Sequence, residues 1–145
     1  MPTNLIKLVV GVESLKDFYD LQQRQTVDYH GEKAVPCWTR YAPKQADEIL
    51  KAEGSIYRVI KGRIECRAKI LGFEMVDIEG VGKKCMIMQS TEMIQTIATP
   101  HRPFQGWRYL KDADIPKDRG LYTGHDLDDE PPADMADELK ELGLL

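Results

Sequence analysis

The sequence predicts a single α+β domain, in which a mixed or antiparallel sheet carries two packed helices. Three observations support this fold class. The chain has 145 residues, 42% of them hydrophobic, which is enough for one domain to bury a core without metals or disulfides. Residues 63–70 alternate between apolar and charged side chains, which is the period of a β-strand with one buried face. Two other segments place apolar residues at helical spacing behind typical helix-start residues.

The first elements expected along the chain are a strand and a helix. Residues 5–10 form a short, largely β-branched segment, which favours a strand. Ser14 stands three residues before Asp17, so its side chain can cap a helix. The apolar residues that follow, from Leu15 onward, keep helical spacing.

A loop and a second helix should come next. Residues 28–36 contain a glycine and a proline, which predicts a loop. Pro43 fits the first position of a helix and Gly54 fits the position just after its end. Between them, Ile49 and Leu50 belong to an apolar stripe that can pack on a sheet.

A β-hairpin is the clearest pattern in the chain. Residues 56–60 form its first strand, Lys61 and Gly62 supply a tight turn, and the alternating segment follows. A further turn at residues 80–82 leads to a third strand at 85–88. The alternation predicts Ile64, Cys66, Ala68 and Ile70 inside, and Arg63, Glu65, Arg67 and Lys69 facing solvent or a ligand.

The later part of the chain is less marked. Residues 93–98 are compatible with a strand or a helix, and residues 104–110 should be extended and partly buried. Several glycines and prolines over residues 116–132 resemble a linker. We expect residues 1–124 to form the globular domain and residues 125–145 to form an acidic C-terminal tail with a short helix.

The charge is divided unevenly between these two parts. The tail contains eight acidic residues and one lysine, which gives it a net charge of −7, whereas residues 1–124 carry +3. Terminal acidic segments are usually solvated, so we expect this one to contribute little to stability. A mildly basic body is compatible with an anionic ligand.

Composition also predicts the compartment. No apolar segment approaches the about 20 residues that a membrane helix needs, and the apolar start of the chain is interrupted by Lys7, unlike a signal peptide. Cys37, Cys66 and Cys85 are odd in number and far apart, which favours a reduced, cytoplasmic protein. Neither the cysteines nor the histidines show the short paired spacing of a metal site, so no metal and no cofactor is expected.

The candidate site is a combination of cations and aromatic rings. Two segments carry it, residues 39–44 and 101–109, with additional cations on the hairpin. Arginine forks and aromatic faces together suit phosphates and stacked bases. The alternative is that the aromatic residues are core and the arginines pair with acids. The candidate ligand-binding residues are Arg40, Lys44, Arg58, Arg102, Gln105, Trp107, Arg108 and Tyr109.

Two resemblances add to these patterns. Residues 5–11, 39–50, 54–74, 102–110 and 141–145 resemble a family of short alphaproteobacterial proteins known only as a domain of unknown function. That resemblance spans nearly the whole chain and implies a bacterial, cytoplasmic protein. At the level of fold, the hairpin is similar to that of PUA and ASCH proteins, which are small β-barrels that bind RNA or modified nucleotides. A small PUA-like β-barrel is therefore an alternative form for the sheet.

The leading functional hypothesis is a nucleic-acid or nucleotide-binding module, with RNA or a nucleotide-like anion as its partner. The alternatives are a small enzyme acting on a phosphorylated or nucleotide-like substrate, and a protein-interaction adaptor. An enzyme should bring acids or histidines together beside the arginines, whereas a binder should show arginines and exposed aromatic faces. An adaptor should bury Trp107 beneath a flat surface.

Overall fold

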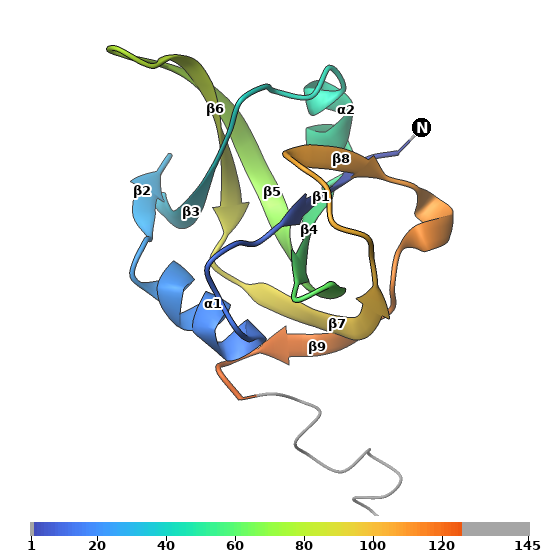
Figure 1. The fold of residues 1–145 in the computed structure, drawn as a ribbon. Helices are drawn as coiled ribbons and strands as arrows, with labels where there is room; N and C mark the ends of the chain where they lie inside the picture. Colours follow the sequence, from blue (N-terminus) through green and yellow to red (C-terminus); the bar gives the residue numbers. More distant parts are fainter. Residues whose placement is uncertain (1, 126–145) are drawn as a thin grey trace, which may run out of the picture.

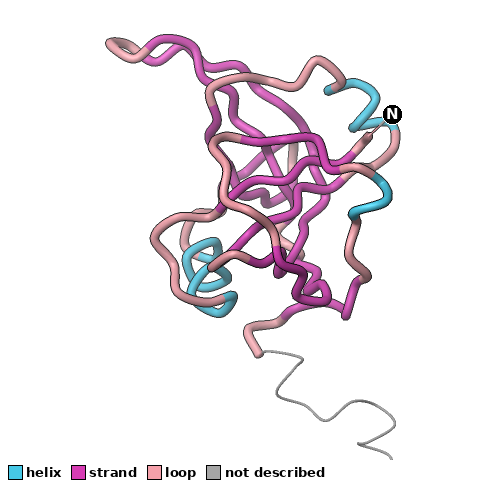
Figure 2. Tube along the Cα trace, turned by 45° about the vertical axis from the view of Figure 1, so that its right-hand side comes forward, coloured by secondary structure: helices cyan, strands magenta, loops and turns pink. Residues whose placement is uncertain are grey.

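Residues 2–125 are described in a computed structural model, whose fold is shown in Figure 1. Nine strands form one mixed sheet, and the helices are few, so the predicted α+β class is broadly correct. Figure 2 shows strand along most of the trace, with the helical turns at its periphery. The strands are β1 (Asn4–Leu8), β2 (Val27–Tyr29), β3 (Glu32–Thr39), β4 (Ser55–Ile60), β5 (Arg63–Ile78), β6 (Gly82–Ser90), β7 (Met93–Pro100), β8 (Trp107–Leu110) and β9 (Asp118–Tyr122). The helices are α1 (Leu15–Gln23), α2 (Ala46–Lys51) and the short 3₁₀ helix η1 (Asp112–Asp114).

The sheet is open, not closed into a barrel. Its strand order is β2-β3-β6-β5-β4-β1-β8, while β7 pairs with β5 and with β9. The pairing of β1 with β4 is parallel, and the other pairings described are antiparallel. The path ends at β2 on one side and at β8 on the other, and among residues 2–125 no ladder joins the two ends. The small PUA-like barrel is therefore not the form that the sheet takes.

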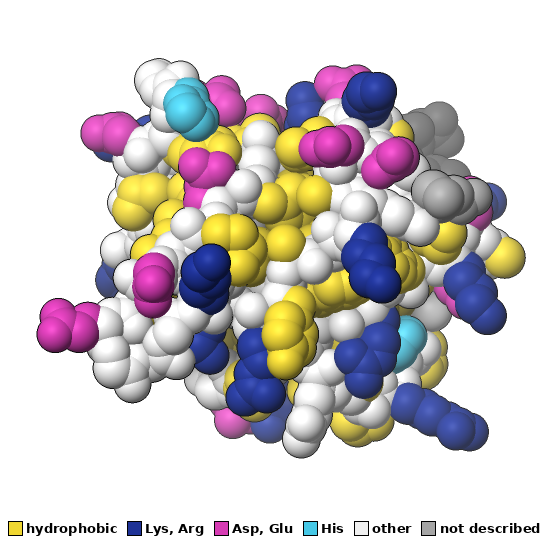
Figure 3. Space-filling view, turned by 90° about the horizontal axis from the view of Figure 1, so that it is seen from above, with side chains coloured by type: hydrophobic (Ala, Val, Ile, Leu, Met, Phe, Trp, Pro, Cys, Tyr) yellow, Lys and Arg dark blue, Asp and Glu magenta, His cyan; other side chains and the backbone are white. Residues whose placement is uncertain are grey.

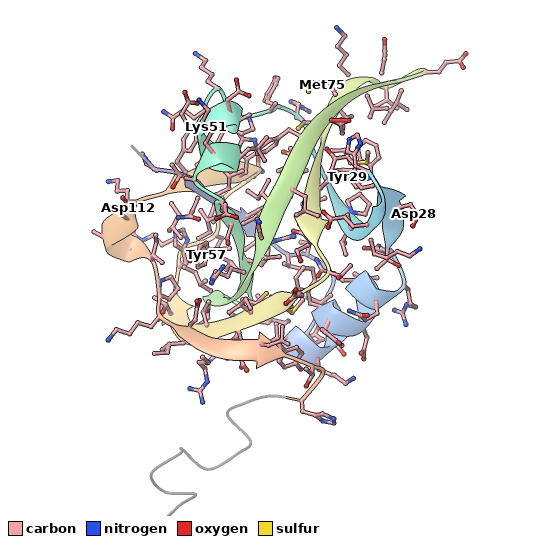
Figure 4. All side chains as sticks on the ribbon, turned by 180° about the vertical axis from the view of Figure 1, so that it is seen from behind. Asp28, Tyr29, Lys51, Tyr57, Met75 and Asp112 are labelled. Carbon is pink, nitrogen blue, oxygen red and sulfur yellow. The ribbon has the colours of Figure 1, made fainter. Side chains whose placement is uncertain are left out.

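The long strand β5 sets the shape of the sheet. Its first half pairs with β4 and β7 and its second half pairs with β6, with a register shift between Ile70 and Gly72. Gly72 lies under the Tyr29 side chain, which leaves no room for a Cβ there. Figure 4 shows Tyr29 beside this strand and Met75 farther out, on the arm where β5 and β6 extend beyond the body. The register shift and the missing side chain allow one strand to serve both parts of the sheet.

The predicted hairpin is confirmed. The side chains of Ile64, Cys66, Ala68 and Ile70 are at most 5% exposed. Their neighbours Arg63 and Lys69 are exposed, whereas Glu65 and Arg67 are half-buried. Lys61 and Gly62 both have positive φ, 53° and 80°, as a two-residue turn of type I′ requires.

Two other segments differ from expectation, and a third takes one of its two predicted forms. The predicted loop at residues 28–36 is the β2–β3 hairpin, since Pro36 is tolerated where β3 has no partner on its second edge. Within the predicted linker, residues 118–122 form β9, whose glycine at position 120 pairs with Gln95. Residues 93–98 belong to a strand. The short helix predicted in the tail lies outside the described residues.

The helices pack on the inner face of the bent sheet. Ser14 caps α1 as predicted, because its hydroxyl oxygen accepts a hydrogen bond of 3.1 Å from the Asp17 backbone N–H. Phe18 of α1 and Ile49 of α2 are buried in separate hydrophobic clusters against the strands. No helix among residues 2–125 is long and apolar enough to cross a membrane.

The second helix is shorter than predicted. It begins at Ala46, three residues after Pro43, because the backbone first makes a turn in which the Ala46 N–H bonds to the Pro43 carbonyl. Residues 40–45 therefore form an irregular connection from β3 to α2.

Candidate functional site

Beyond its short pairing with β2, the outer edge of β3 faces β8 without backbone pairing. We call this gap, between β3 with residues 40–45 on one side and β8 on the other, the seam. Side chains bridge it: the Trp107 indole Nε1–H donates to the Tyr41 carbonyl oxygen at 2.7 Å, and the Gln45 N–H donates to the Tyr109 hydroxyl at 3.3 Å. Both rings also pack against the buried cluster that contains Cys37. The seam is thus held by aromatic side chains where a barrel would have a strand ladder.

A groove of about 480 Å³ lies at the seam. Arg40 and Tyr41 stand on one side of it, and Gln105, Trp107 and Arg108 stand on the other. No acidic side chain lines this groove among the described residues. Tyr41 is 67% exposed, so one face of its ring is open to a ligand. We call this concavity the seam groove.

Arg108 is oriented by its own segment. One guanidinium nitrogen, Nη1, donates to the carbonyl oxygens of Gln105 at 2.6 Å and Trp107 at 2.9 Å, and the group lies 5.5 Å from the centre of the Phe104 ring. These contacts hold the exposed Arg108 guanidinium in place. The N–H groups of Nη2 and Nε remain available to donate to a ligand. Such a fixed fork is suited to phosphate or a base edge.

Arg108 also lines a second cavity, of about 230 Å³, together with Arg102 and Tyr109. A third cavity, of about 590 Å³, continues from there and is lined by His101, Arg102 and Asp114 among others. The seam groove and these two cavities therefore follow one another through shared arginines. Figure 3 shows basic side chains gathered around hydrophobic surface in its lower half, with most of the visible acids in the upper half.

Two of the predicted site residues lie elsewhere. Lys44 is exposed but lines none of these cavities. The expectation that Pro43 opens a helix is wrong, because α2 starts at Ala46 and the Gln45 N–H just before it is bonded to the Tyr109 hydroxyl. Arg58 is only 7% exposed and points into the protein.

Arg58 is held by uncharged partners. Its Nε donates to the Lys7 carbonyl oxygen at 3.3 Å, its Nη1 contacts the Cys37 sulfur at 3.7 Å, and its guanidinium carbon lies 4.9 Å from the centre of the Phe18 ring. Sequence reasoning missed Lys7 and Cys37 as its neighbours. The only signal available was a lysine inside an otherwise apolar strand.

Arg67 agrees with the alternative interpretation, in which the arginines pair with acidic side chains. It forms a two-fold contact with the Asp118 carboxylate, at 2.8 and 2.6 Å, and donates to the Ser55 hydroxyl at 2.8 Å. The hydrogen bond from Arg67 lowers the pKa of Asp118. This arginine is therefore committed to the β5–β9 contact and is not available to a ligand.

The cysteines offer little for chemistry. Burial raises the pKa of Cys66 to about 12 and that of Cys85 to about 11, so both remain protonated thiols. Cys37 is buried in β3. Within residues 2–125 no cluster of three His, Cys, Asp or Glu side chains could hold a metal ion.

Comparison with known proteins gives a family and no activity. Residues 5–145 match the family described as "Protein of unknown function (DUF1489)", and the chain belongs to that family. No curated protein and no solved structure matches the chain.

Proposed function

We propose that this member of a family of unknown function binds single-stranded nucleic acid, RNA in the first instance, through the seam groove. One observation carries the proposal. Two segments about 60 residues apart in sequence bring Arg40, Gln105, Trp107 and Arg108 around one groove that no acidic side chain of the described residues lines. The family comparison is neutral on this point.

The groove has what a single strand requires. Guanidinium groups on its two sides can contact successive phosphates, and the exposed Tyr41 ring can stack on a base. The Gln105 side chain, exposed between them, can donate to and accept from a base edge. The continuation of the cavities past Arg102 gives a longer strand further cationic surface. The free thiols suit a reduced, cytoplasmic setting for this binding.

Fluorescence anisotropy with labelled single-stranded and structured RNA, at two salt concentrations, tests the proposal. Affinity should fall steeply with salt, with a slope near the number of neutralised phosphates. Arg108→Ala should weaken binding by about 1–3 kcal/mol if its fork makes a two-fold contact. The control is Arg63→Ala, which removes an exposed arginine outside the groove and should change affinity little. No binding up to about 100 μM, where even non-specific association is normally seen, would remove the nucleic-acid function.

A second candidate is an enzyme acting on a phosphorylated small molecule. His101 and Asp114 line the two cavities beside Arg102, so an acid and an imidazole stand next to a phosphate-binding cation. The His101 ring lies edge-on to Phe104, with Nδ1 2.8 Å from the Arg102 carbonyl oxygen, so the tautomer that donates from Nδ1 leaves Nε2 as an acceptor. Turnover of phosphorylated nucleotides that is lost in His101→Ala, with no RNA affinity in the unaltered chain, would favour this candidate.

A further inference from the structure

Arg58 is the most unusual charged residue in the described structure. A guanidinium keeps its charge at any ordinary pH, and removing it from water is costly unless a carboxylate compensates it. Arg58 is 7% exposed, and its contacts are a carbonyl oxygen, a thiol and an aromatic ring. Among residues 2–125 no carboxylate forms an ion pair with it. The charge is therefore buried without a counterion.

A second cation stands beside it. Lys7 of β1 is the residue in register with Arg58 in the parallel β1–β4 pair, so both side chains leave the same face of the sheet. Lys7 is half-buried, and within the described chain it too has no ion pair. The inner face thus carries two adjacent positive charges with no negative charge to balance them.

These cations are linked to the wall of the seam groove by strand register. Trp107, in the wall of the groove, is the residue of β8 in register with Lys7, so Trp107, Lys7 and Arg58 form one row across three neighbouring strands. Thr39, on the other wall, is two residues from Cys37, which Arg58 contacts, and points to the same face of β3. Each wall of the groove therefore contains a residue that is linked by strand register or by the same strand face to a neighbour of Arg58, Lys7 on one side and Cys37 on the other.

The seam can open without breaking a strand pair. Two hydrogen bonds are described across it, one from the Trp107 indole N–H to the Tyr41 carbonyl oxygen and one from the Gln45 N–H to the Tyr109 hydroxyl. Rotation of the Trp107 side chain away from Tyr41 would remove one of these bonds and leave the β1–β8 ladder intact.

We propose that Arg58 and Lys7 form a site for a terminal phosphomonoester, which enters through the seam once Trp107 moves aside. A phosphomonoester carries about −1.5 to −2 charge near neutral pH, which matches the two unbalanced cations. A phosphodiester carries one negative charge and continues in both directions along its strand, so it suits the open groove and not an interior position. The inference rests on the proposed function only for the identity of the molecule that bears the phosphate. That molecule is an RNA end, a mononucleotide or inorganic phosphate itself.

Thermal melts of the full chain test the site without RNA. Inorganic phosphate or AMP, compared with chloride at equal ionic strength, should raise the Tm of the unaltered chain by about 3 °C or more at saturating concentration. Arg58→Met should lose this increase and should melt, without phosphate, at or above the unaltered chain, because an uncompensated charge is gone. The matched control Arg24→Met removes an exposed arginine and should keep the increase.

RNA ends provide the second measurement. Oligonucleotides with a 5′- or 3′-terminal phosphate should bind about 10-fold more tightly than the same sequences with hydroxyl ends, and Lys7→Gln and Arg58→Met should remove this preference. Arg108→Ala should weaken both kinds of oligonucleotide and keep the preference. If no RNA binds but phosphate still stabilises the chain through Arg58, the proposed function fails and the phosphate site remains.

The inference is overturned if phosphate and AMP stabilise the unaltered chain no more than chloride does. It is also overturned if Arg58→Met and Arg24→Met respond to phosphate as the unaltered chain does. If Arg58→Met does not fold, Lys7→Gln takes its place: an undiminished phosphate response in that variant contradicts the paired site.

Discussion

Arg67 and Arg58 are nine residues apart on two paired strands, yet only Arg67 has a carboxylate counterion among the described residues. Arg67 meets the Asp118 carboxylate through two nitrogens, whereas Arg58 meets none among the described residues. An arginine on the solvent-exposed face of a strand can recruit an acid from another strand of the same sheet at little cost, as Arg67 does with Asp118 of β9, beyond β7. An arginine on the inner face can form an ion pair only if a carboxylate is also buried beside it.

The Arg67–Asp118 pair should make stability depend on acid. Because the hydrogen bond from Arg67 lowers the pKa of Asp118, its contribution is present above the pKa of the unfolded carboxyl and is lost as pH falls through the lower folded value. Asp118→Asn should therefore cost about 1 kcal/mol at pH 7, the upper end for a pair this exposed. Melts from pH 7 to about 2.5 should show the two Tm values approaching each other below the unfolded carboxyl pKa of about 3.9.

The control for this prediction is Asp28→Asn, which removes the exposed Asp28–Lys33 pair and should change Tm little at any pH. A Tm difference between the unaltered chain and Asp118→Asn that stays constant down to the lowest pH would contradict the role given to the carboxylate.

Gly54 marks a place where no side chain fits. A Cβ there would collide with the Thr3 carbonyl oxygen and lie 3.0 Å from the Ile49 Cγ2. Gly54→Ala should lower the free energy of unfolding by about 2–4 kcal/mol, as overpacking against backbone does. Denaturant titration measures it. Gly80→Ala, at φ +79° with open space around its Cβ, should lose only about 1 kcal/mol through backbone strain.

At the level of elements, the β4–β5 turn can be improved. Lys61 adopts a positive φ of 53°, which asparagine tolerates better than lysine, and its ion pair with Glu13 is exposed. Lys61→Asn gives the Asn-Gly pair preferred in type I′ turns, so it should stabilise the chain by about 0.5 kcal/mol in urea titrations. A loss of stability would show that the Glu13 pair outweighs the turn.

Elements that follow a local rule could be predicted, and elements that depend on distant partners could not. The alternation along β5 identifies its two faces, and Ser14 identifies the start of α1. Pro36 and Gly120 resemble loop residues, yet their strands are held by β6 and β7, whose positions the local sequence does not encode. Whether the sheet closes depends likewise on the distance between its end strands.

The residues of the candidate site likewise divide into those that the local sequence could predict and those that it could not. Arg102 and Arg108 share one short segment, so their proximity could be predicted, and Arg40 could be added as a hypothesis from composition. Arg58 lies in β4, whose sequence shows no alternation, and all six residues of this strand are buried. A strand covered on both faces gives the sequence no means of telling its sides apart.

For the whole molecule, the division of charge leads to a prediction about the acidic tail. A chain ending at Gly124 loses a net charge of −7 and keeps the basic seam groove. It should bind RNA more tightly, because the tail competes for the same cations, and its Tm should change by less than about 8 °C. Anisotropy and thermal melts on the two lengths check both points. A larger drop, near about 2 kcal/mol, would make the tail part of the core.

The position of β1 decides when a growing chain can fold. This strand lies between β4 and β8, so Leu5 needs Ile56 on one side and Tyr109 on the other. During synthesis at about 5–20 residues per second, the first strand must wait for its second neighbour until nearly the whole domain has been made. The consecutive strands β4 to β7 can meanwhile pair through short connections. We expect folding to start in this central meander, and the earliest strand to be fixed only when β8 arrives, so the strand that completes the pairing of β1 is also the one that carries Trp107.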